Sequence, residues 1–281
     1  MLKKTGIVLD STSYLEREYA EKHNIKVVPL SVNINGKVFD EGFCGEYDEI
    51  YREIVEHDGI LKTSQPPFGK FIEAYQELFD EGAEQILTIC FSSVLSGTAN
   101  GAVLAANEFS DRTIKVIDTY TAAGVLKNLI KESIADLEKD DDLDRIEERI
   151  KREVEKSTID LTVLDLGYLK RGGRLSNSQA LIGNLLKIKP IISLLDGGLT
   201  LTEKVRGTRK AVNTMIDKIK AQDTEPRKIS IGYIKDKESV LKLRDEIEEK
   251  FPDAEVTMDE VGPVIGGHLG PGSFGICTLY K

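Results

Sequence analysis

The sequence predicts an α/β protein, and three features of the chain point to this class. Short apolar segments with strand character, at residues 5–9 and 85–91, are each followed by a polar turn and then by a helix. The turns are rich in serine and threonine, as at Ser92 and Ser93. At 281 residues the chain is long enough for two domains, and we place them at residues 1–157 and 158–281.

The N-terminal half alternates strands and helices. Asn35 and Gly36 predict a hairpin, because this pair favours a tight turn. The prolines that follow Thr63, Ser64 and Gln65 mark the start of a helix with apolar residues at helical spacing. The expected elements are a strand at 5–9, a helix at 14–23, strands at 25–32 and 37–39, a helix from 68, a strand at 85–91, a helix ending at 109, a strand at 114–117 and a charged helix at 143–154.

The C-terminal half is expected to mix strands and helices. The elements are a strand at 158–166, a hairpin at 191–205, a helix at 206–219, a strand at 229–233, a helix at 240–251 and strands at 255–258 and 276–280. The last two strands flank six glycines around His268. Glycine lets the backbone approach a ligand closely, so we expect a loop in which His268 serves a site or the structure.

The hydroxyl-rich turns form the first candidate site. In an open parallel sheet, ligands bind beyond the carboxyl ends of the strands, so these turns should share one edge. Helix N-termini at this edge would present backbone N–H groups to a carboxylate or phosphate. Each turn alone is also explained by helix capping, but the hydroxyls exceed what the caps need.

Residues 166–194 form the second candidate site. Lys170, Arg171 and Arg174 surround a glycine pair, and residues 180–192 are strongly apolar. The cations suit an anionic head or a partner surface, while the apolar run lines a cavity or packs as a buried helix. Both interpretations stay open.

Composition excludes several classes of protein. Asp and Glu outnumber Lys and Arg by 48 to 38, and the basic residues are mostly interleaved with acidic ones. This argues against a nucleic-acid groove. No apolar stretch approaches the ~20 residues that span a bilayer, and the three cysteines lack disulfide or zinc spacing. We expect a cytoplasmic protein, and transient contact with a membrane surface stays open.

The assembled motifs resemble those of the DegV family, bacterial fatty-acid-binding proteins that include the binding subunits of fatty acid kinase. The matching segments, among them TSQP and LKRGGRLS, occur in the family's order over nearly the whole chain. They lie at residues 10–12, 63–66, 92–98, 118–119, 169–176, 183–190 and 262–270. The resemblance implies an N-terminal, mostly parallel Rossmann-like sheet domain and a C-terminal mixed α/β domain, with a fatty-acid tunnel between them.

The resemblance also implies roles for individual residues. Thr63, a serine of the 92–98 loop and His268 would bind the fatty-acid carboxylate. We favour Ser93 as the direct contact and Ser96 as the cap of the loop and helix. For coupling to the kinase, the resemblance indicates Arg174 and also Arg171.

The activity implied is that of a carrier. In the resembled systems a separate ATP-dependent kinase converts the bound acid to an acyl phosphate for phospholipid synthesis, and this chain has no GxxxxGK[ST] loop. We therefore expect no metal and no cofactor beyond the fatty acid. One alternative is an acyl hydrolase or transferase using Ser93 or Ser96 with His268 and Asp10. The other is a sensor of a different small anion.

Overall fold

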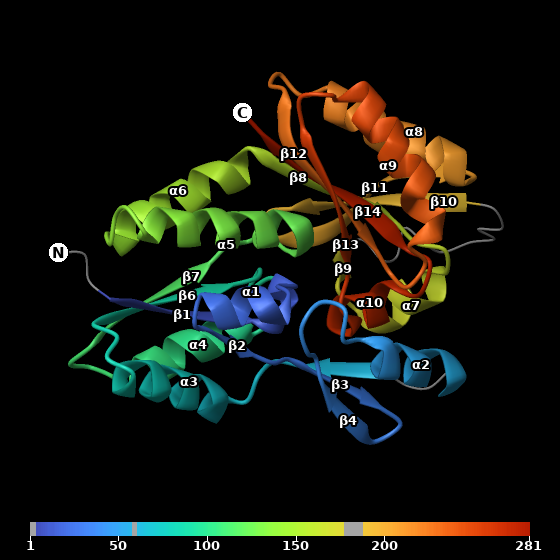
Figure 1. The fold of residues 1–281 in the computed structure, drawn as a ribbon. Coiled ribbons are helices and arrows are strands. Elements are labelled where there is room, and N and C mark those ends of the chain that lie inside the picture. Colours follow the sequence, from blue (N-terminus) through green and yellow to red (C-terminus); the bar gives the residue numbers. More distant parts are fainter. Residues whose placement is uncertain (1–3, 58–60, 177–187) are drawn as a thin grey trace. The chain divides into compact units, whose positions relative to one another are not determined.

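The computed structural model describes residues 4–57, 61–176 and 188–281 (Figure 1). The chain is divided into two compact units. The first comprises Met1–Ala122 and Leu126–Arg152, and the second comprises Ala123–Val125 and Glu153–Lys281. Asn177 and Ser178, and most of the apolar run that begins at residue 180, lie outside the described residues.

The first unit is built on a parallel sheet with the strand order β2-β1-β6-β7. Its strands are β1 (Thr5–Asp10), β2 (Ile25–Val28), β6 (Gln85–Cys90) and β7 (Thr113–Asp118). Helices α3 (Phe68–Asp80) and α4 (Thr98–Ala106) cover one face, and α5 (Ala123–Leu137) lies over the other (Figure 1). Buried side chains of α3, such as Phe71 and Tyr75, pack with Val8 and Ile86 of the sheet. The predicted parallel sheet is confirmed.

A small antiparallel sheet belongs to the same unit. It contains β3 (Ser31–Ile34), β4 (Lys37–Asp40) and β5 (Leu61–Ser64) in the order β4-β3-β5. The hairpin at Asn35 and Gly36 is confirmed, and both residues have the positive φ that its turn requires. The single strand predicted at 25–32 is wrong. Pro29 lacks an N–H group for a strand ladder, and the chain leaves the parallel sheet there.

The other elements of the first unit are short or mostly exposed. The predicted helix at 14–23 begins later, because a single 3-10 turn and Tyr14 with positive φ precede it. The charged helix predicted at 143–154 is present, and it buries Leu143, Ile146 and Ile150. The bounds are η1 (Ser11–Ser13), α1 (Arg17–Lys22), α2 (Asp48–His57) and α6 (Leu143–Glu155), whose last residues belong to the second unit.

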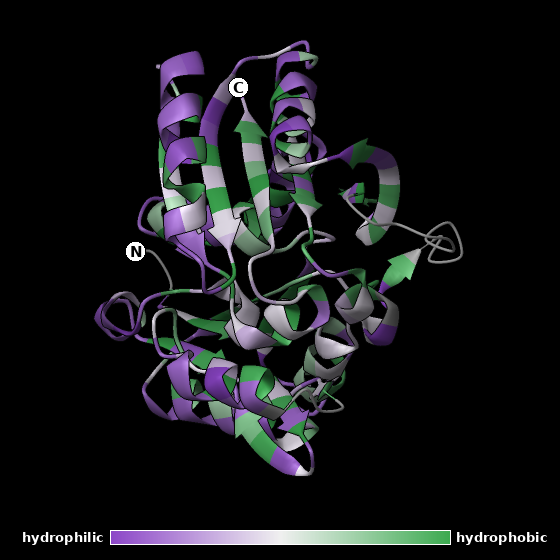
Figure 2. Ribbon diagram, turned by 90° about the vertical axis from the view of Figure 1, so that its right-hand side faces the viewer, coloured by the Kyte–Doolittle hydropathy of each residue, from purple (hydrophilic) through white to green (hydrophobic). Residues whose placement is uncertain are grey.

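The second unit is built on a mixed sheet of seven strands with the order β13-β12-β14-β8-β10-β11-β9. The strands are β8 (Ser157–Thr162), β9 (Leu175–Ser176), β10 (Ile188–Leu195), β11 (Gly198–Arg206), β12 (Pro226–Tyr233), β13 (Glu255–Glu260) and β14 (Phe274–Tyr280). The helices are α7 (Leu166–Gly172), α8 (Thr208–Lys220), α9 (Glu238–Lys250) and α10 (Pro263–Leu269). Helices α8 and α9 bury Met215 and Ile247 against Ile231 of β12. Their alternating purple and green bands reflect one polar and one apolar face (Figure 2).

Two expectations for the second unit have opposite outcomes. The hairpin between β10 and β11 is confirmed, with Asp196 and Gly197 at positive φ in its turn. The glycine-rich loop predicted around His268 is wrong, because this segment forms α10. Pro263 occupies the first turn of that helix, where its missing N–H group costs nothing.

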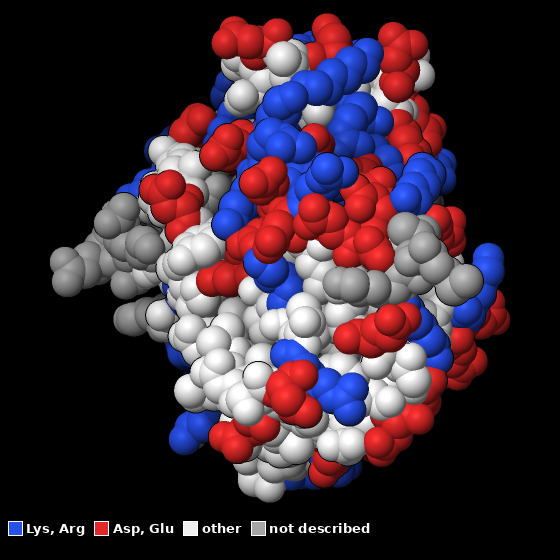
Figure 3. Space-filling view, turned by 90° about the vertical axis from the view of Figure 1, so that its left-hand side faces the viewer, with Lys and Arg blue, Asp and Glu red and all other residues white. Residues whose placement is uncertain are grey.

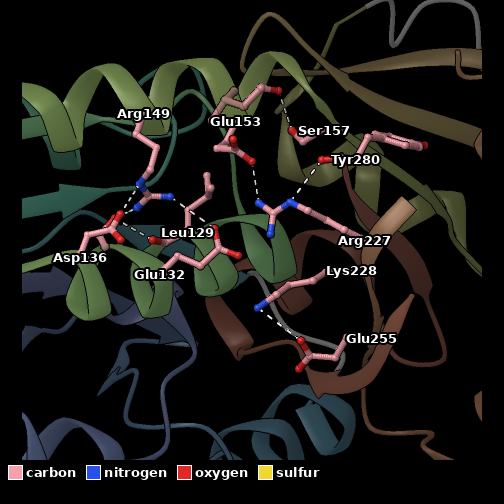
Figure 4. Close-up of polar contacts among 12 residues, drawn as sticks. Leu129, Glu132, Asp136, Arg149, Glu153, Ser157, Arg227, Lys228, Glu255 and Tyr280 are labelled. Carbon is pink, nitrogen blue, oxygen red and sulfur yellow. Dashed lines mark hydrogen bonds and ion pairs between the residues drawn. The ribbon is translucent and has the colours of Figure 1, made fainter. Parts of the chain in front are cut away.

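Several charged side chains form ion pairs with side chains of opposite charge. On the face drawn in Figure 3, Lys and Arg are interspersed with Asp and Glu. In the first unit, Arg149 of α6 contacts Asp136 of α5 at 2.6 Å, and in the second unit Arg227 contacts Glu153 at 2.6 Å (Figure 4). Within the described ranges, none of the helices has the length and apolar character needed to cross a membrane.

Candidate functional site

The first group of candidate residues lies where β1 and β6 end. In the sheet, β1 lies between β2 on one side and β6 on the other. The chain therefore builds the sheet outward from β1 in one direction with β2 and in the opposite direction with β6 and β7. Such a reversal is where open α/β sheets bind ligands. The Asp10 carboxylate accepts hydrogen bonds from the backbone N–H groups of Thr12 and Phe91, both over 2.9 Å. It therefore ties together the two turns that carry the serines.

Burial changes the acidity of Asp10. The side chain is fully buried, and loss of solvent raises its pKa from 3.8 to about 6, while the hydrogen bonds from Thr12 and Phe91 oppose this rise. A carboxyl group in this position holds the turns in place. The described hydrogen bonds of the Asp10 carboxylate all come from Thr12 and Phe91.

The loop after β6 places Ser93 and Ser96 above the same edge. The backbone N–H of Ser93 donates to Asp118 at the end of β7 over 3.1 Å. The Ser96 hydroxyl pairs with the hydroxyl of Thr98 at 2.9 Å. Ser93 and Ser96 are both half-buried.

Helix capping does not account for these hydroxyls. The N-cap of α4 is Gly97 and that of α5 is Ala122, and neither helix has a side-chain cap. The predicted role of Ser96 as a helix cap is therefore wrong. The hydroxyls of Ser93 and Ser96 therefore do not cap either helix.

Thr63 enters this group through its neighbour Gln65. Thr63 lies on β5, opposite Val32 of β3, and is half-buried. The side chain of Gln65 lies against Gly97, so closely that a Cβ atom at Gly97 would be 2.0 Å from Gln65 Oε1. The segment that carries Thr63 is thus packed against the loop that carries Ser96, within the first unit.

The second group lies in the second unit, where α10 packs against α7. His268 of α10 is half-buried and lies beside Gly172, the last residue of α7. Burial and, to a smaller extent, the positive charge of Arg174 together lower the pKa of the His268 imidazole from 6.5 to about 4. His268 is therefore neutral at pH 7 and offers one N–H donor and one acceptor.

The two arginines of the second group differ in their surroundings. Arg174 donates from Nη1 to the backbone carbonyl of Gly172 over 2.8 Å. Arg171 places its guanidinium over the ring of Tyr168, 4.9 Å from the centroid. Both side chains are exposed, so each is accessible to an anionic group or to another protein.

Sequence reasoning missed two contacts of the site. It quoted Gln65 and Gly172 within motifs but gave them no role, although Gln65 packs on Gly97 and Gly172 packs on His268. The only available signal was the presence of glycine at positions 97 and 172. The described part of the chain contains no cluster of side chains suited to a metal ion.

Comparison with known proteins agrees with this arrangement of motifs. The profile of the DegV family matches residues 4–281, which is nearly the entire chain. The chain belongs to the DegV family. A DegV domain-containing protein of Listeria innocua is 33% identical over 284 residues, with 100% of both chains covered. The protein DegV of Bacillus subtilis is 31% identical, with 98% of this chain and 99% of that chain covered.

Solved structures of the family share this fold. A DegV family protein from Thermus thermophilus, described as fatty-acid binding, has a TM-score of 0.89 and 30% identity, covering 99% of this chain and 100% of that chain. DegV of Bacillus subtilis, described as a fatty acid binding protein, has a TM-score of 0.88 and 28% identity, with the same coverage of both chains. The expected DegV-like fold is confirmed, and these neighbours are fatty-acid-binding proteins.

Proposed function

We propose that this chain binds one long-chain fatty acid and presents its carboxylate to a separate ATP-dependent fatty acid kinase, which forms the acyl phosphate. The observation that carries the proposal is the similarity over 99% of the chain to structures described as fatty-acid binding. In this proposal the chain is a carrier, and the kinase supplies the catalysis.

The carboxylate would be bound by hydroxyls and by His268. Thr63 and Ser93 are the proposed hydroxyl donors, with Ser96 in support, and the neutral imidazole of His268 is the proposed third donor. Because the pKa of His268 is lowered, its imidazole would donate to the carboxylate as an uncharged group at pH 7. Arg174, with Arg171 beside it, is proposed to act in coupling to the kinase.

Affinity and orientation would come from different parts of the ligand. Burying about fourteen methylenes at ~0.8 kcal/mol each gives roughly 11 kcal/mol before the costs of ordering. A hydrogen bond to the charged carboxylate contributes only about 1.5–3 kcal/mol. The acyl chain therefore determines how tightly the ligand binds, and the polar residues determine how it is oriented.

Mass spectrometry of the purified full chain under native and then denaturing conditions tests the proposal. We expect an adduct of one fatty acid, released intact on denaturation, or uptake of added oleate or palmitate. If the protein shows no adduct and takes up no added fatty acid, the fatty-acid proposal is wrong and a polar anion becomes the favoured ligand. Turnover of an acyl ester that is lost in Ser93→Ala would instead support the hydrolase alternative.

A variant of Thr63 tests the assigned carboxylate contact. Thr63→Val keeps the shape and strand preference of the side chain but removes the hydroxyl. Loss of a hydrogen bond to a charged group predicts oleate affinity lower by about 10- to 100-fold. Thr113→Val is the matched control, because Thr113 is an exposed threonine on β7. Equal affinity in the two variants would refute the role of Thr63.

A further inference from the structure

Gly172, at the C-terminal end of α7, is in direct contact with the side chain of His268. A Cβ atom built on Gly172 would lie 2.6 Å from His268 Nδ1 and 3.1 Å from His268 Cβ. Real Cβ atoms essentially never show the first distance, and the second is tighter than most, so a side chain at residue 172 would displace the imidazole from its position. Gly172 itself is buried.

Arg174 forms a hydrogen bond with the backbone of the same glycine. Its guanidinium donates to the carbonyl oxygen of Gly172 over 2.8 Å, and a hydrogen bond from a charged donor is stronger than a neutral one. The chain reverses between these residues at Gly173, which has a φ of +65° and nothing within 4 Å of its Cβ position. The glycine pair therefore has two distinct roles, contact at Gly172 and backbone conformation at Gly173.

We infer that Gly172 and Arg174 form a support that positions the His268 imidazole, so that both are positioning residues for the ligand contact made by His268. The inference rests on the proposed function for its purpose but not for its geometry. It gives Arg174 a role within the chain in addition to coupling with a kinase.

The electrostatic surroundings agree with this role. Helix α10 has no titratable side chain other than that of His268. From the neighbouring segment Arg174 acts on the imidazole, while Arg171 of α7 lies over Tyr168. Tyr168 in turn packs against Gly270, just beyond α10. Burial and the positive charge of Arg174 both favour the neutral imidazole.

The test is a titration of the histidine side chains by NMR in the full chain freed of lipid. The protein has three histidines, and the variant His268→Gln identifies which signal belongs to His268. The native His268 is expected to titrate near pH 4. Gly172→Ala should displace the ring into solvent and raise this pKa by about one unit or more toward the value of a free imidazole.

Matched variants separate the support from general damage. Gly173→Ala should leave the His268 pKa unchanged, because no atom lies near its Cβ position, although the strained φ lowers stability. Arg174→Gln should raise the His268 pKa, whereas Arg174→Lys, which retains the charge, should raise it less. If Gly172→Ala does not fold, the Arg174 pair decides the question.

Each outcome bears on the support or on the fatty-acid proposal, and the two are distinguishable. An unchanged His268 pKa in both Gly172→Ala and Arg174→Gln would overturn the support, whether or not the protein binds lipid. A raised pKa in a protein that takes up no oleate would keep the support and overturn the fatty-acid proposal. If the support and the fatty-acid proposal are both correct, Gly172→Ala should also bind oleate about tenfold more weakly, as expected for one misplaced hydrogen bond.

Discussion

The carboxylate of Asp10 accepts a hydrogen bond from the backbone N–H of Phe91, with 2.9 Å between Oδ2 and N. This contact joins the residue that ends β1 to the first residue beyond β6, its neighbour in the sheet. The turn with Ser11–Ser13 and the loop with Ser93 and Ser96 start from these two points. The positions of both turns therefore depend on one buried carboxyl group.

Asp10 predicts a measurable pH dependence of stability. Its folded pKa of about 6 lies above the ordinary 3.8, so the unfolded chain releases the proton more readily. Ionisation thus favours unfolding, and stability is lost as the pH rises from about 4 through 6. A difference of about two units corresponds to about 3 kcal/mol. Denaturant unfolding between pH 4 and 8 should show this slope reduced in Asp10→Asn.

The comparison needs two precautions. His268 contributes the opposite slope, because its folded pKa of about 4 is below 6.5 and stability is lost as the pH falls from 6.5 to 4. The difference between native protein and Asp10→Asn cancels that contribution. Asp253→Asn, at an exposed position, is the control. If Asp10→Asn and the control have the same slope, the raised pKa of Asp10 is wrong.

Gly97, the N-cap of α4, and Gly101, inside α4, predict different effects of substitution by alanine. Gly97→Ala would place a Cβ atom 2.0 Å from Gln65 Oε1 and so displace Gln65, whereas Gly101→Ala meets Gln65 at 3.5 Å, an ordinary contact. Gly101→Ala should raise stability by about 0.5–1 kcal/mol, because alanine is the better residue inside a helix. Gly97→Ala should lower oleate affinity several-fold.

Isothermal titration with oleate and thermal unfolding of both variants check this pair. The double variant Gly97→Ala with Gln65→Ala removes the steric conflict. If Gln65 holds the segment of Thr63 against the loop, the double variant should remain weak in oleate binding. Full recovery of affinity in the double variant would show that Gln65 does not serve the site.

Local signals in the sequence predicted the turns and the long helices correctly. Asn35–Gly36 and Asp196–Gly197 favour one turn type by themselves, so no distant residue had to be known. The strand at 25–32 failed because apolar character continues through Pro29, whereas the pairing partner changes there. The helix at His268 failed because its glycines favour a loop in isolation, and its burial against α7 outweighs that preference.

The motifs in the sequence indicated candidate residues but not the contacts that these residues make. Motif resemblance named Thr63, Ser93 and His268. It could not show that Gln65 lies on Gly97 or that Gly172 lies under His268, because each pair is distant in the chain and glycine has no side chain to signal a contact. Such pairs are set by packing, which only the folded chain defines.

Ser93 and Ser96 are predicted to contribute unequally to carboxylate binding. The Ser96 hydroxyl already pairs with Thr98 at 2.9 Å, so a ligand would compete with that partner. Ser93 is held through its backbone by Asp118, which leaves its hydroxyl to the ligand. Ser93→Ala should therefore weaken oleate binding by about tenfold or more, and Ser96→Ala by less. The reverse order in isothermal titration would transfer the direct contact to Ser96.

Reversal of charge at the two arginines predicts an effect on phosphoryl transfer that exceeds the effect on lipid binding. Arg174→Glu removes an exposed cation whose proposed partner is the kinase or the transferred phosphate, so the rate of acyl phosphate formation with a fatty acid kinase and ATP should fall steeply. Arg171→Glu is the matched change, because Arg171 is also exposed but lies over Tyr168, and its effect should be smaller. Oleate affinity is measured for both variants in parallel. Equal losses of affinity and rate in Arg174→Glu would mean that Arg174 acts on the ligand through His268 alone, and its role in kinase coupling would be wrong.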